Sequence, residues 1–98
     1  MARYLVLWEL DETKVPLDPG DRAAAWSPML DMVESDMKTG RLKDWAAHAG
    51  ALRGYSVAEG SEFEVATNCQ KYIPYVRFTV HPLTSLAEMR QMLQDMPK

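Results

Sequence analysis

A β-strand over Arg3–Leu10 would place alternate side chains on its two faces. Both of the resulting sets are largely apolar. One set is Tyr4, Val6, Trp8 and Leu10, and the other is Arg3, Leu5, Leu7 and Glu9. A strand with one face in water shows a clean apolar–polar alternation, because successive side chains point to opposite faces of the sheet. We therefore expect this strand to be covered on both faces.

Length and composition describe one small domain with an ordinary balance of apolar and charged residues. The chain has 98 residues, 47% of them hydrophobic and 26% charged, and a formal net charge of −3. At roughly 100–200 residues per domain, this length allows one domain over residues 1–98. The acidic balance argues against a nucleic-acid partner, and no apolar run reaches the ~20 residues of a membrane helix. The single cysteine, Cys69, excludes an intrachain disulfide, and we expect a cytoplasmic protein.

Periodicity and turn residues predict a strand, a helix, two strands, a helix, a strand and a final helix. The predicted strands are residues 3–10, 42–49, 54–58 and 75–81. Asp18 and Pro19 are typical of a helix start, and Ser61 and Ser85 each begin a capping box that opens a further helix. Pro28, inside the first helix, predicts either a kink or a restart after a break at Ser27-Pro28.

The first six elements form two βαβ-like halves joined by a hairpin. This is the ferredoxin-like βαββαβ arrangement of an α+β fold, here with an extra C-terminal helix. Its four-stranded antiparallel sheet carries helices on one face only, so the other face of the apolar first strand needs a partner. The simplest solution is a homodimer through the sheet face, in which two sheets close into a dimeric α/β barrel.

A set of short motifs runs from the first strand to the last. The motifs are Gly40, Trp45, Gly50, Tyr55-Ser56-Val57, the helix start at Ser61, Pro74-Tyr75, Val80 and Pro82-Leu83. Together, over roughly residues 3–83, they resemble the core of muconolactone isomerase-like proteins of the dimeric α/β-barrel superfamily. The resemblance implies the same fold and a dimeric assembly, and it suggests isomerase chemistry. That family tends to carry a lysine in the first strand, where this chain has Leu7.

Polar and titratable side chains on the predicted strands form a candidate site. The catalytic candidates are Glu9, His48 and His81, and the substrate-binding candidates are Asp44, Trp45, Tyr55 and Arg77. If the polar face of the last strand lines the dimer cavity, a carboxylate or imidazole there would act as a general base. Arg77 would then hold a carboxylate substrate. The alternative is structural: Arg77 with Glu9 as an ion pair, and the aromatic candidates as packing residues.

The residues leave two functions open. One is a cofactor-independent isomerase or lyase that acts on a small organic acid in the dimer cavity. The other is a non-catalytic homodimeric module that binds a small ligand or a protein partner. No metal-ligand spacing, phosphate-binding loop or nucleophile elbow occurs, so we predict neither a metal nor another cofactor. An enzyme should bring at least two of the titratable candidates together around one enclosed pocket.

Overall fold

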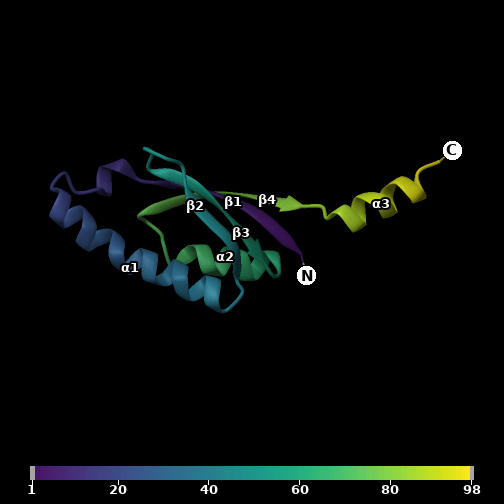
Figure 1. Cartoon of the computed structure of the whole chain (residues 1–98), viewed down its shortest axis with the longest axis horizontal. Coiled ribbons are helices and arrows are strands. Elements are labelled where there is room, and N and C mark those ends of the chain that lie inside the picture. Colours follow the sequence, from purple (N-terminus) through teal and green to yellow (C-terminus); the bar gives the residue numbers. More distant parts are fainter. Residues whose placement is uncertain (1, 98) are drawn as a thin grey trace.

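The computed structural model describes residues 2–97 and contains one four-stranded antiparallel sheet (Figure 1). Its strands are β1 (Arg3–Leu10), β2 (Leu42–Ala47), β3 (Arg53–Glu59) and β4 (Val76–Leu83). They lie in the order β2-β3-β1-β4, and every neighbouring pair is antiparallel. The chain is therefore an α+β fold with an open sheet, and its topology is compatible with the predicted ferredoxin-like arrangement.

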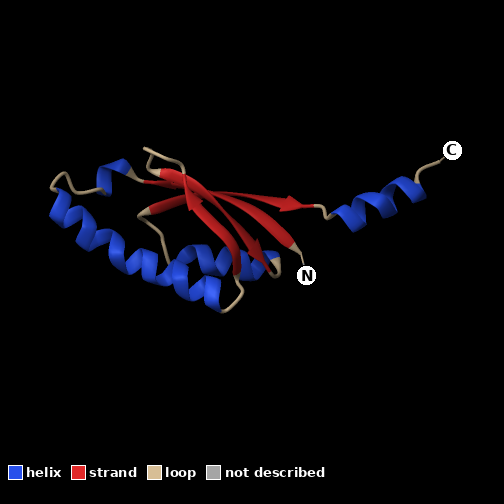
Figure 2. Ribbon diagram, viewed as in Figure 1, coloured by secondary structure: helices blue, strands red, loops and turns tan. Residues whose placement is uncertain are grey.

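Two helices cover one face of the sheet. They are α1 (Pro19–Lys38) and α2 (Glu62–Gln70), and both lie on the same side of the strands (Figure 2). A short 3₁₀ helix, η1 (Glu12–Lys14), precedes α1, and a third helix, α3 (Leu86–Asp95), lies beyond the end of β4. The predicted helix starts are confirmed, because Asp18 accepts a hydrogen bond from the Asp21 amide and both serine capping boxes are formed.

Helix α1 runs through Pro28 without a break. The predicted restart at Ser27-Pro28 is therefore wrong. Proline removes one intrahelical hydrogen bond, but Pro28 lies on the exposed side of the helix, where water can satisfy the carbonyl left without a partner.

Three of the four strands have boundaries that differ from the prediction by one or two residues. Strand β2 ends at Ala47 rather than at residue 49, and β3 extends beyond residues 54–58 at both ends. Strand β4 begins one residue later than predicted and continues through Pro82 to Leu83. A proline is tolerated there because β4 is an edge strand, with one side free of sheet partners.

The apolar core lies between the sheet and helices α1 and α2. Its buried residues are Val6, Leu10, Val33, Leu42, Ala58, Val65, Tyr72 and Val76. One of the two apolar sets of β1 therefore faces the helices, as Val6 and Leu10 show. The expected cover of this face is confirmed within a single chain.

The other apolar set of β1 lies on the opposite face of the sheet. Its neighbours in register come from β3, where Leu5 pairs with Val57 and Leu7 pairs with Tyr55. We call the surface made by these four residues the helix-free face, since α1 and α2 both lie on the other side (Figure 2). Leu7 is 39% exposed, so within the described chain the expected second cover is missing.

The capping box at Ser61 gives a simple test of how α2 is held. The Ser61 hydroxyl accepts a hydrogen bond from the Glu64 amide, and the Glu64 carboxylate accepts one from the Ser61 amide. We expect Ser61→Ala to lower the free energy of unfolding by about 1 kcal/mol, measured by urea denaturation. Ser35→Ala, at an exposed position within α1, should leave it unchanged or slightly higher because alanine is the better helix former, and equal losses would contradict the role of the cap.

Candidate functional site

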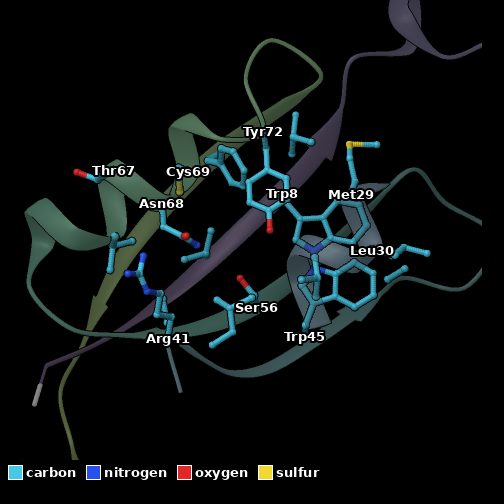
Figure 3. A pocket seen from close by; sticks show the side chains of 18 of the residues that line it. Trp8, Met29, Leu30, Arg41, Trp45, Ser56, Thr67, Asn68, Cys69 and Tyr72 are labelled. Carbon is cyan, nitrogen blue, oxygen red and sulfur yellow. The ribbon is translucent and has the colours of Figure 1, made fainter. Parts of the chain in front are cut away.

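A cavity of about 480 Å³ lies between the sheet and helices α1 and α2 (Figure 3). Its size falls within the roughly 300–1,000 Å³ of small-molecule sites in proteins. The lining is mostly apolar and comes from all four strands and both helices. Both α1 and α2 lie over this space on the same side of the sheet. The cavity therefore lies in the same layer as the core.

Two stacked indoles form one end of the cavity. Trp8 on β1 and Trp45 on β2 have ring centroids 5.2 Å apart and planes inclined by 5°. The Trp8 indole N–H donates a hydrogen bond to the Tyr55 carbonyl oxygen at 3.2 Å, which holds the ring in place. Met29 and Leu30 of α1 face this aromatic end (Figure 3). A flat apolar ring would find good contacts here.

Gly54 makes the indole stack possible. It pairs with Trp8 in the register of β1 and β3, and the Trp8 ring passes directly over its backbone. A Cβ at this position would overlap the Ala46 carbonyl oxygen and would lie 2.5 Å from Cζ2 of Trp8. Gly54 was predicted only as the start of a strand, although a glycine inside a strand is itself a signal of close approach.

A buried carboxylate, Asp36, joins helix α1 to helix α2 and to the turn that follows α2. Asp36 lies on α1 and is 4% exposed. It accepts hydrogen bonds from the Asn68 side-chain amide at 3.0 Å, from Lys71 Nζ at 3.1 Å and from the Tyr72 hydroxyl at 3.3 Å. Burial, with the nearby charge of Asp36, raises the pKa of the Tyr72 phenol above its usual range. The phenol therefore stays protonated and available as a donor.

The polar groups at this end leave one acceptor free. Oδ1 of Asn68 is buried and has no hydrogen-bond partner among the described residues. The Asn68 amide, the Tyr72 hydroxyl and the buried Ser56 point toward the same space (Figure 3). A buried acceptor without a partner is destabilising, so a ligand donor would be favourable there once a small turn of the Asn68 side chain exposes Oδ1 to the cavity. Cys69 also lines the cavity, and burial raises the pKa of its thiol, which makes it a poor nucleophile.

This polar cluster was not predicted from the sequence. Asp36 follows the apolar residue Val33 by three positions, which places it on the same side of α1. Asn68 follows the buried Val65 of α2 by three positions in the same way, and Tyr72 lies two residues beyond the end of α2. A polar residue on the buried side of a helix is the sequence pattern that could have indicated this cluster.

Among the predicted site residues, only Trp45 lines the cavity. The Tyr55 hydroxyl donates a short hydrogen bond to the Asp44 carboxylate, which raises the pKa of Tyr55. Glu9 and Arg77 form an ion pair with 3.8 Å between Arg77 Nη2 and Glu9 Oε1, and their side chains are 55% and 68% exposed.

The two histidines are exposed and lie apart from the cavity. His48 follows the end of β2, and His81 lies on β4 opposite Leu5. In a single chain, the titratable candidates therefore do not meet around one enclosed pocket. Their proposed roles remain predictions about the helix-free face.

Comparison with models of known protein families finds no match, and comparison with curated proteins finds no similar sequence. Within residues 2–97, no helix combines the length and apolar character needed to cross a membrane. The same residues contain no group of three or more histidine, cysteine or carboxylate side chains arranged to hold a metal ion.

Proposed function

We propose that this protein binds a largely apolar, ring-bearing small molecule in the cavity between the sheet and helices α1 and α2. The observation that carries this proposal is the apolar cavity with stacked indoles at one end and a free buried acceptor at the other. Binding sites for small molecules have this character: mostly apolar walls with a few placed polar groups.

The lining also indicates which polar group the ligand carries. Asn68 Oδ1 accepts hydrogen bonds only, so it calls for a hydroxyl or N–H on the ligand. The Tyr72 hydroxyl and Ser56 point toward the same space (Figure 3). Arg41 lies among the lining residues together with Glu59 and Glu64, so this part of the wall carries both signs of charge. A neutral ring with one hydroxyl group suits this arrangement better than a free carboxylate.

We also propose that the chain works as a homodimer that pairs its helix-free faces, as its resemblance to muconolactone isomerase-like proteins implies. Leu5, Leu7 and Val57 support this, because they place an apolar surface where a second sheet would pack. In such a dimer each chain would keep its own cavity on the helix side.

A second candidate is the cofactor-independent isomerase or lyase acting on a small organic acid between the two sheets. The Asp44–Tyr55 hydrogen bond and the Glu9–Arg77 ion pair favour it, because a dimer would enclose these groups. Arg77 would bind the carboxylate, and Glu9 or His81 would move the proton.

One NMR titration of amide signals separates the two candidates. We expect 1-naphthol, a flat ring system with one hydroxyl, to bind saturably and to shift the Trp45 indole and Asn68 side-chain signals. The small organic acid levulinate should shift neither of them. Levulinate shifts at Tyr55 and Arg77, without any naphthol shift in the cavity, would overturn the first candidate and favour the second.

The role of Asn68 can be tested with a matched ligand. Naphthalene has the shape of 1-naphthol without the hydroxyl, and it should bind about tenfold more weakly because the acceptor stays without a partner. In the Asn68→Leu variant this preference should disappear, while binding of naphthalene is retained. An unchanged preference in the variant would show that the hydroxyl is recognised elsewhere.

A further inference from the structure

Helix α3 makes almost no contact with the rest of the described chain. Every described residue from position 79 to 97 is exposed, including all of α3. Figure 1 shows α3 extending away from the sheet in the direction of β4. The molecule is consequently elongated, with extents of 61 × 25 × 20 Å.

Helix α3 nevertheless has the sequence of a packed helix. Its apolar residues recur every three or four positions and form one stripe, made of Leu86, Met89, Leu93 and Met96. All four are at least 41% exposed, and Leu93 is 62% exposed. A capped helix of ten residues is only marginally stable alone in water, and packing this stripe against an apolar surface would stabilise it.

The total surface of the chain is larger than a compact monomer of its mass would expose. The accessible surface is 7182 Å². A folded monomer of 11.1 kDa should expose only about 5,700 Å². The excess is about 1,500 Å², in the range of the roughly 1,000–2,500 Å² that one chain contributes to an obligate homodimer.

The chain itself carries the second apolar surface that such a contact requires. Leu83, at the start of the projecting segment, pairs with Arg3 on the same side of the sheet as Leu5 and Leu7. On β4 this side carries Thr79 and His81 and ends in Leu83, which is 41% exposed, so one apolar side chain of the helix-free side lies next to the start of α3. Only Thr84 and Ser85 separate β4 from α3, and they direct the helix away from its own sheet.

We propose that α3 is an exchanged arm whose apolar stripe packs against a second copy of the chain. In a two-fold symmetric contact each copy gives one arm and receives one. The proposal shares the homodimer with the function proposed above, but it is independent of the ligand and of the cavity. It adds that α3, and not only the sheet face, holds the two copies together.

Sedimentation equilibrium of the full-length chain tests the arm. We expect wild type to be a dimer at micromolar concentration and Leu93→Glu to raise the dimer dissociation constant at least tenfold. Gln94→Glu is the matched control, since it adds the same charge to α3 outside the stripe and should leave the constant within twofold. A Leu93→Glu variant as dimeric as wild type would overturn the proposal, as would a monomeric wild-type protein.

Two further measurements separate the arm from the sheet contact. Hydrogen exchange of the α3 amides should be slowed in the wild-type dimer and fast in Leu93→Glu. Leu7→Glu should weaken the dimer if the helix-free faces pair. If Leu7→Glu weakens it and Leu93→Glu does not, the sheet contact stands and the arm is refuted; the opposite result supports the arm and refutes the paired sheets.

Discussion

Gly54→Ala should lower the free energy of unfolding by about 3 kcal/mol or more, because the new methyl group has no room. It would overlap the Ala46 carbonyl oxygen of the neighbouring strand and press on the Trp8 indole. Backbone oxygen cannot move aside without separating β2 from β3, and Trp8 cannot move without leaving its stack with Trp45. The substitution therefore damages the sheet and the aromatic end of the cavity together.

Urea denaturation of Gly54→Ala and Gly50→Ala measures this effect against a matched control. Gly50 has a positive φ of 74° and nothing within 4 Å of the added Cβ, so alanine there meets backbone strain but no steric overlap. That strain costs about 1–2 kcal/mol. If Gly54→Ala is no more destabilising than Gly50→Ala, the close approach of Trp8 to the β3 backbone is not important for stability.

Asp36→Ala should destabilise the fold by about 3 kcal/mol, the second large effect that we expect. Removing the carboxylate leaves the Asn68 amide and the Tyr72 hydroxyl without their acceptor inside the helix layer. Lys71 loses its partner as well, but its side chain is 41% exposed and can turn toward water. The loss arises mainly from the two neutral donors and from the space left behind.

Two control variants make the Asp36 measurement specific. Glu34→Ala removes an exposed carboxylate from the same helix, together with its ion pair to Lys38, and should change the unfolding free energy by less than about 0.5 kcal/mol. Tyr72→Phe removes one donor but keeps the ring that packs edge-on against Phe78, and it should cost about 1 kcal/mol. A loss in Asp36→Ala no larger than in Glu34→Ala would mean that the cluster does not stabilise the helix layer.

The same cluster connects stability with binding. Asp36 accepts hydrogen bonds from Asn68 and Tyr72, which both line the cavity, and so holds these two side chains in place. Its loss should therefore weaken 1-naphthol binding more than naphthalene binding, under conditions where the variant is still folded. A parallel loss for both ligands would indicate a general disturbance of the cavity.

Local signals in the sequence determined the elements of this protein and most of their starts. Asp18, Ser61 and Ser85 mark helix starts because their side chains satisfy amides only a few residues away. The two apolar sets of β1 were also visible, since alternation along a strand is a property of neighbouring residues. The βαββαβ order of elements and an antiparallel four-stranded sheet were also predicted, and the observed sheet is compatible with them.

The tertiary structure alone decided what those elements enclose. The Trp8–Trp45 stack, the opening left by Gly54 and the hydrogen bonds of Asp36 each join segments that lie far apart in the chain. Local periodicity says which residues share a side of an element, but not how far that side stands from the next element. The cavity exists because α1 and α2 lie at a distance from the sheet. Helix α3 projects because β4 directs the chain beyond the sheet. Both features depend on how the elements are placed relative to one another, which no pattern within a single element specifies.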